Sequence, residues 1–197
     1  MKGRHHHYTC DTIDRRLVHV FLAILSILLA YLLNRLEMAY EFQIPWWVDA
    51  PAVFGFYGAL YIVFKKRLWK KKFIRTIFFI ETPNWNGTYE CSLQSSHDNF
   101  ETKTAATLTI KQDWDSMLIL LKTETSKSES LSGSFSMKDL IEPVLTYEYM
   151  NYPNPDASSD MQIHHGMASI RLDQKKLQGD YFNGRGRNRF GKFNQVD

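Results

Sequence analysis

The chain has 197 residues, of which 44% are hydrophobic, and it carries 24 Lys and Arg against 21 Asp and Glu, a net charge of +3. This length has room for a pair of membrane helices and one domain of modest size. Residues 1–80 hold 12 basic and 5 acidic side chains, whereas residues 81–197 hold 12 and 16. A net acidic C-terminal part argues against binding a nucleic-acid polymer, because that affinity depends mainly on neutralising phosphates.

Two apolar runs near the N-terminus predict a two-helix transmembrane hairpin over residues 17–72. Residues 17–33 contain no Asp, Glu, Lys or Arg. With the next few residues, this run approaches the roughly 20 residues that a helix needs to cross a bilayer. A second apolar run, residues 44–64, ends abruptly at three basic residues. We therefore expect two helices joined by a loop at about residues 36–46.

Basic residues on either side of the hairpin predict its orientation. Lys and Arg occur before the first run and again in residues 65–75, whereas Arg35 is the only basic residue between the runs. Lys and Arg accumulate on the cytoplasmic side of membrane proteins with short loops. Residues 1–16 are therefore expected to form a cytoplasmic tail, the loop to be periplasmic, and both termini to be cytoplasmic.

Small residues in the second run bear on helix packing. Gly55 and Ala59 are four residues apart, a spacing that lets helix backbones approach closely. The pair is typical of helix–helix association, within the hairpin or between protomers. Ordinary glycine usage in a membrane helix is the alternative.

Residues 73–82 are expected to link the hairpin to a second domain. Apolar residues recur there at helical spacing with basic residues between them: Trp69, Phe73, Ile77 and Ile80. This pattern is typical of an amphipathic segment at the membrane surface. A strand at residues 76–80 is the alternative. The turn-forming residues around Pro83 then mark the start of the domain, residues 83–197.

The second domain shows a repeating two-residue alternation that predicts an all-β fold. Short alternating segments are separated by turn residues, at 85–93, 105–112, 117–123, 131–137, 144–152, 161–172, 176–183 and 189–195. About eight strands with tight connections favour an antiparallel up-and-down β-barrel. Closure of the barrel removes exposed strand edges. A barrel of this size holds packed side chains or one small ligand.

Motifs of catalysis are missing from the sequence. It contains no nucleophile elbow, no phosphate-binding loop and no His-Glu-x-x-His pair. His164 and His165 are neighbours on a predicted strand and so point to opposite faces. Cys10 and Cys91 are expected to be free thiols on the reducing side of the membrane. The sequence therefore predicts a protein that is not an enzyme, with no metal site and no cofactor.

Aromatic, amide and guanidinium side chains gather on a few strands and predict a site for a small anion. Guanidinium groups match phosphate geometry, tyrosine rings stack on bases, and asparagine reads a base edge. The segment from residue 180 to residue 196 has no acidic residue after Asp180. The candidate ligand-binding residues are Trp85, Tyr89, Tyr149, Asn151, Tyr181, Asn183, Arg185, Arg187 and Arg189.

Two alternatives bear on these residues. The tyrosines could pack as core while the arginines form a solvated hairpin tip. The assignment also depends on strand register, because a slip of one residue would turn Tyr181, Asn183 and Arg185 outward together.

Two membrane helices followed by a strand-rich cytoplasmic domain in fewer than 200 residues resemble one family. The motif Trp85-Asn86-Gly87-Thr88-Tyr89 opens the barrel region, and the motif Gly179-Asp180-Tyr181-Phe182-Asn183-Gly184 comes just before the arginines. The chain resembles the two-transmembrane, β-strand-rich effectors associated with bacterial cyclic-nucleotide synthases in CBASS antiphage defence.

This resemblance implies a function for each part of the chain. A lipocalin-like barrel would sense a cyclic dinucleotide made by a cognate nucleotidyltransferase during infection. Binding would drive homo-oligomerisation of the membrane helices, disrupt the bacterial inner membrane and kill the cell before phage mature. The implied partners are the cyclic dinucleotide, the lipid bilayer and further copies of the chain.

Two other functions remain open at this point. A membrane-anchored barrel could carry a lipid or fatty acid, with an arginine as the carboxylate clamp. An apolar patch made of Leu108, Ile110, Ile119 and Leu121 is compatible with that function. A structural membrane adaptor with a fully packed barrel would instead have no pocket.

Overall fold

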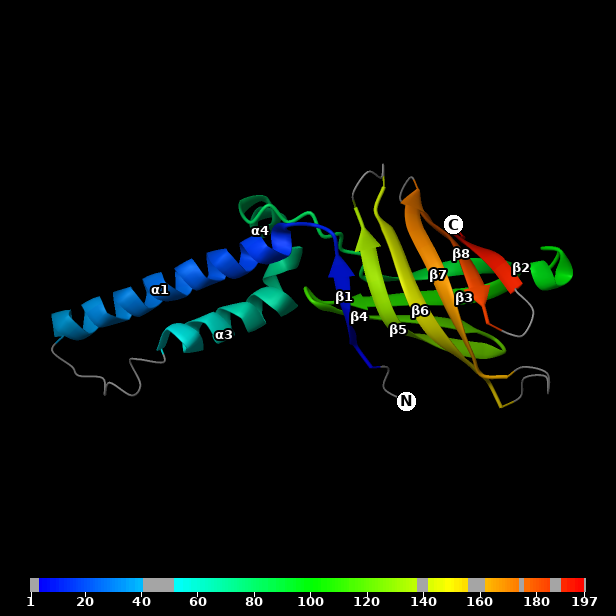
Figure 1. Cartoon of the computed structure of the whole chain (residues 1–197), viewed down its shortest axis with the longest axis horizontal. Helices are drawn as coiled ribbons and strands as arrows, with labels where there is room; N and C mark the ends of the chain where they lie inside the picture. Colours follow the sequence, from blue (N-terminus) through cyan, green and yellow to red (C-terminus); the bar gives the residue numbers. More distant parts are fainter. Residues whose placement is uncertain are drawn as a thin grey trace. The chain divides into compact units, whose positions relative to one another are not determined.

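The chain folds into two compact units, one made of residues 12–82 and the other of residues 1–11 together with residues 83–197. The computed structural model describes residues 4–40, 52–137, 142–155, 162–173, 176–184 and 189–196. Each unit is described by itself below (Figure 1). The division between Thr82 and Pro83 falls where turn-forming residues interrupt the sequence pattern.

The first unit is helical. Helix α1 spans Asp14–Tyr40 and α3 spans Ala52–Lys66; the 3₁₀ turn η1 (Leu68–Lys70) and the short helix α4 (Lys72–Ile77) follow. Helices α1 and α3 pack against each other. His19 of α1 lies 2.7 Å from the Tyr57 hydroxyl of α3 and its ring stacks on that tyrosine.

One helix of the described residues, α1, is long and apolar enough to cross a membrane. It has 27 residues and therefore includes residues 36–40, which were predicted to belong to the loop. Residues 41–51, with the start of the second apolar run, lie outside the described residues, and α3 has 15 residues. The apolar N-terminal helix is therefore confirmed, whereas the two-helix hairpin remains a proposal.

The second unit is a closed β-barrel (Figure 1). Its strands are β1 (His6–Cys10), β2 (Gly87–Ser95), β3 (Thr104–Gln112), β4 (Ser116–Thr123), β5 (Ser126–Ser136), β6 (Val144–Pro153), β7 (His164–Asp173), β8 (Lys176–Asn183) and β9 (Arg189–Gln195). From β2 to β9 each strand pairs antiparallel with the next, and β9 pairs with β2. These eight strands have the up-and-down order that the alternation predicts.

Strand β1 was not predicted, because residues 1–16 were interpreted as a tail. Strands β4 and β5 pair with each other only from Leu120 opposite Glu129 to Lys122 opposite Lys127. Beyond that point β1 lies between them, antiparallel to β4 and parallel to β5. The prediction missed it because β1 has just five residues and a single fully buried one, Tyr8.

The two alternatives for residues 73–82 are also decided by the structure. Residues 72–77 form α4 and no strand forms at 76–80, so the helical interpretation is correct for the first part of the linker. Phe79, just after α4, has a φ of 50°, a left-handed conformation that ends a helix at some cost for a bulky residue.

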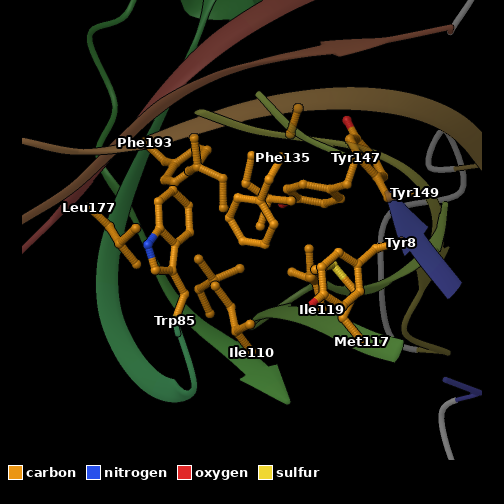
Figure 2. Close-up of a cluster of buried hydrophobic side chains, with 14 of the residues drawn as sticks. Tyr8, Trp85, Ile110, Met117, Ile119, Phe135, Tyr147, Tyr149, Leu177 and Phe193 are labelled. Carbon is orange, nitrogen blue, oxygen red and sulfur yellow. The ribbon is translucent and has the colours of Figure 1, made fainter. Parts of the chain in front are cut away.

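Alternate residues of each strand point into the barrel and form its core. Trp85 packs edge-to-face against Phe135, with ring centroids 5.1 Å apart. Figure 2 shows Trp85, Phe135, Phe193 and Leu177 in this core, together with Tyr8 of β1, whose ring packs edge-to-face against Phe135. Burial of these large side chains supplies the main favourable term for folding, at roughly 25 cal/mol per Å² of apolar surface.

Candidate ligand-binding cavity

One end of the barrel holds a partly open cavity of about 350 Å³. It lies at the end that carries the β2–β3, β4–β5, β6–β7 and β8–β9 connections, since its walls include the last residues of β2 and the first residues of β3. A wider and more open groove of about 880 Å³ runs over the outer face of β5, β6 and β7. The cavity is the better site for a small ligand, because its walls surround more of a ligand than the wider groove does.

Five of the predicted ligand-binding residues line this cavity: Tyr149, Asn151, Tyr181, Asn183 and Arg189. They come from three strands, β6, β8 and β9. Tyr149 and Asn151 are two residues apart on β6, as are Tyr181 and Asn183 on β8, so each pair lies on one face of its strand. Tyr149 and Asn183 both lie opposite Gly166 of β7, which brings the two pairs to the same inward face. The face argument therefore holds for these strands, and ligand contact by the five residues stays a prediction.

The other predicted residues do not lie in the described cavity. Trp85 is 3% exposed and belongs to the packed core, and Tyr89 donates its hydroxyl hydrogen to the carbonyl of Trp85. Both point inward, but nearer the opposite end of the barrel, so the structure does not bring them to this cavity, and ligand contact by Trp85 and Tyr89 stays a prediction. Arg185 and Arg187 lie outside the described residues.

Glycines fix the two cavity tyrosines in place. A Cβ atom on Gly166 would lie 2.3 Å from the ring of Tyr149, and one on Gly191 would lie 2.3 Å from the ring of Tyr181. Each tyrosine is directly opposite its glycine on the neighbouring strand. Aromatic rings of this kind cover the space left by a glycine in a curved sheet. The glycines therefore determine where the rings lie in the cavity wall.

Burial keeps these tyrosines neutral. Desolvation, with a smaller contribution from Tyr181, raises the pKa of Tyr149 well above its usual value, and desolvation also raises the pKa of Tyr181. The Tyr149 hydroxyl donates to the carbonyl of Phe182 at 3.0 Å. Since that hydroxyl is engaged with the backbone, the ring of Tyr149 is the part that a ligand would contact.

The turn after β2 supplies cavity residues that sequence reasoning missed. It contains the 3₁₀ turn η2 (Ser96–Asp98), and Ser95, His97, Asp98 and Thr102 all line the cavity. A hydrogen bond from the Thr102 side chain, and a weaker effect of the Thr102 backbone N–H, lower the pKa of Asp98. Turn residues have no periodicity, so the alternation could not predict them. Phe100 in this turn has a φ of 66°, a strained conformation that occurs preferentially at functional sites.

Two acceptor oxygens of the cavity-lining residues lack a hydrogen-bond partner among the described residues. Within the part of the chain that the structure describes, Asp98 Oδ1 and Asn183 Oδ1 are buried and have no hydrogen-bond partner. Buried polar atoms are nearly always paired, so such exceptions need an explanation. A ligand that donates N–H groups, such as a nucleobase, would supply the missing partners.

The thiols fit a structural role better than a catalytic one. Cys91 is 2% exposed, and burial, followed by the charge of Glu90, raises its pKa to about 11. A thiol is a good nucleophile only as the thiolate. Cys10 lies on β1 and is not bonded to Cys91. Among the described ranges, with their gaps, no three His, Cys, Asp or Glu residues are grouped to hold a metal ion.

Comparisons with known proteins cover both units. Residues 80–196 match the family model described as Cap15, cyclic dinucleotide receptor domain, and residues 17–70 match Cap15, TM helices. CD-NTase-associated protein 15 of Yersinia aleksiciae is 33% identical over 183 residues, which are 89% of this chain and 85% of that protein. The chain therefore belongs to the Cap15 family, with a cyclic dinucleotide receptor domain after TM helices.

Proposed function

We propose that this chain is a membrane effector of bacterial CBASS antiphage defence that is switched on by a cyclic dinucleotide. The ligand binds in the barrel cavity, and binding drives oligomerisation of the membrane helices, disruption of the inner membrane and cell death. The observation that carries this proposal is the cavity itself, into which Tyr149, Asn151, Tyr181, Asn183 and Arg189 converge. The Cap15 family match supports the class of ligand.

The chemistry of the cavity suits such a ligand. A cyclic dinucleotide presents two phosphates and two bases. Arg189 offers a guanidinium to a phosphate, the rings of Tyr149 and Tyr181 offer faces for stacking, and Asn151 and Asn183 offer amides to base edges. A volume of about 350 Å³ is within the range of small-molecule sites. No cofactor is needed besides the activating ligand, which a cognate nucleotidyltransferase supplies.

We infer two membrane spans with both termini in the cytoplasm. Helix α1 is long enough for one span, and the second apolar run, of which α3 is the described part, is the other. The match to Cap15 TM helices covers both runs. Basic residues precede the first run and follow the second. This distribution favours a cytoplasmic position for both termini at the bacterial inner membrane.

A lipid or fatty acid is the second candidate ligand, and the cavity favours it less. Only three aliphatic residues, Leu93, Leu121 and Ala168, are part of the described wall, whereas hydroxyl and amide side chains make up much of the rest. An acyl chain would offer no partner to Asn183 Oδ1, a buried oxygen of the described wall without a hydrogen bond, at a cost of about 1–3 kcal/mol. The cavity itself argues against the third function, a fully packed adaptor.

The proposed function is tested with the full chain in detergent and in vesicles of phosphatidylethanolamine and phosphatidylglycerol. The full chain is required because β1 belongs to the barrel. We expect a cyclic dinucleotide from a panel of cyclic di-AMP, cyclic di-GMP and cyclic di-UMP to raise the melting temperature and release a trapped dye. Palmitate is the comparison for the lipid function. Stabilisation by palmitate alone would contradict the proposal, as would dye release that no panel member changes.

Gly55→Leu is expected to abolish dye release without changing ligand affinity. Gly55 and Ala59 are exposed on α3, and no atom lies within 4 Å of a Cβ added at Gly55. This favours packing against another protomer over packing within the unit. Gly55→Ala is the matched control, because a methyl group still allows close helix approach. Loss of ligand binding by Gly55→Leu would instead mean that the residue is needed for folding.

A further inference from the structure

The chain crosses from the barrel unit to the helical unit after residue 11 and returns after residue 82. These two crossings are called the outgoing and the returning passage. One buried side chain of the barrel makes hydrogen bonds to the chain before the first and after the second. Gln112, the last residue of β3, is 2% exposed. Its Nε2 donates to the Tyr8 hydroxyl at 3.0 Å and to the Pro83 carbonyl at 2.9 Å, and its Oε1 accepts the Trp85 N–H at 3.0 Å. Tyr8 comes before the membrane helices in the chain, and Pro83 and Trp85 come after them.

The outgoing passage, from strand β1 to helix α1, is short. Strand β1 ends at Cys10 and α1 begins at Asp14. The Asp11 carboxylate accepts the backbone N–H of Met137, just beyond β5, at 2.8 Å. The Tyr8 hydroxyl also donates to the Trp114 carbonyl at 2.9 Å. The barrel therefore holds the chain up to three residues before the first residue of α1.

On the helical side, a second buried residue holds the two passages together. Asp14 is 0% exposed. Its Oδ2 accepts the backbone N–H of Glu81 at 3.0 Å, and both the N–H and the hydroxyl of Thr82 at 2.8 Å. The end of the helical unit is thus bonded to the start of α1. In the sequence, residues 12 and 13 separate Asp11 from Asp14, and Pro83 directly follows Thr82.

Strand β1 is also connected to the cavity wall. The Ser130 hydroxyl lies 2.7 Å from His6 Nε2 of β1 and accepts the backbone N–H of Ile119 at 2.9 Å. Ser130 stands directly opposite Tyr149, which lines the cavity. A ligand that moves Tyr149 would therefore shift Ser130 on β5 and, through it, β1. These contacts form a continuous route from Tyr149 through Ser130 to β1.

We propose that Gln112 is a positioning residue that fixes β1 and the returning passage to the barrel, so that occupancy of the cavity is transmitted to α1. This inference rests on the proposed function, because it concerns how the bound barrel acts on the membrane helices. Strand β1 then couples ligand binding in the cavity to helix α1, and the N-terminal residues belong to the sensor.

The test combines Gln112→Leu with an engineered disulfide. Leucine fills similar space but bonds neither passage. We expect Gln112→Leu to bind the most potent panel member with a Kd no higher than that of the wild type, while dye release at saturating ligand falls by about 5- to 150-fold, the usual range of coupling between sites. A disulfide between Thr9→Cys and Ser134→Cys, which are paired and exposed, should reattach β1 and restore release.

The control is a disulfide that stabilises the barrel elsewhere. Thr88 and Thr109 are paired on β2 and β3, and the Thr88→Cys/Thr109→Cys pair should not rescue Gln112→Leu. Mass spectrometry confirms each bond, and dithiothreitol should remove the rescue. Normal dye release by Gln112→Leu would overturn the inference, as would equal rescue by both disulfides, which would assign Gln112 to stability alone. A wild-type chain without ligand-dependent release would contradict the proposed function, together with the inference that rests on it.

Discussion

Arg189→Ala is expected to weaken binding of a cyclic dinucleotide by about 10- to 150-fold. Arg189 is the one arginine of the described residues that lines the cavity. A hydrogen bond to a charged group contributes about 1.5–3 kcal/mol, and each 1.4 kcal/mol is a factor of ten in Kd. Arg189→Lys should lie between the wild type and Arg189→Ala, because lysine keeps the charge but loses the paired donors. Isothermal titration at fixed salt measures all three.

Lys192→Ala is the matched control for Arg189→Ala. Lys192 is on the same strand, three residues further on, and is exposed on the outer face opposite Asp180. It changes the net charge by the same amount and leaves the cavity intact. Equal losses of affinity for the two variants would show that Arg189 acts only through net charge, and the assignment of a phosphate contact would be wrong.

Gly166→Ala is expected to lower the free energy of unfolding by about 3 kcal/mol, at the upper end of the usual cost of overpacking. The added Cβ would lie 2.3 Å from the Tyr149 ring and 2.4 Å from the backbone carbonyl of Phe182. The ring could move, but the backbone of β8 cannot do so cheaply. Displacement of Tyr149 should also weaken ligand binding. Denaturant unfolding monitored by circular dichroism measures the stability change.

Gly184→Ala provides the comparison for Gly166→Ala. Gly184 directly follows the last residue of β8, and the nearest atom to its added Cβ is the His165 carbonyl oxygen at 3.3 Å. We expect a loss well below 1 kcal/mol, as is usual for exposed positions without a special contact. Similar losses for both variants would mean that the close contact between Gly166 and Tyr149 is not the cause of the lower free energy of unfolding.

The alternation of side chains predicted the face of a residue but not its depth along the barrel. For Tyr149, Asn151, Tyr181 and Asn183 the predicted inward face is the cavity face. Trp85 also points inward, but it packs in the core, because inward positions near one barrel end are filled by neighbouring side chains. A two-residue period carries no information on which end of a strand is open. The depth comes from tertiary packing.

Short elements were the other part that the sequence could not reveal. Strand β1 has five residues, of which two are histidines and the others tyrosine, threonine and cysteine, and it has no run of alternating apolar side chains. Its partners are more than 100 residues away in the chain. The turn that brings His97 and Asp98 to the cavity is equally irregular. By contrast, the long apolar run in α1 was evident from composition alone.

The position of β1 also determines the order in which the molecule can be completed during synthesis. Strand β1 leaves the ribosome first, and α1 follows it immediately, yet the strands on either side of β1 are made only after both apolar runs. Contacts between residues so far apart in the chain form slowly. Strand β1 therefore stays without one of its partner strands, joined to an apolar helix that is already made, until β5 emerges.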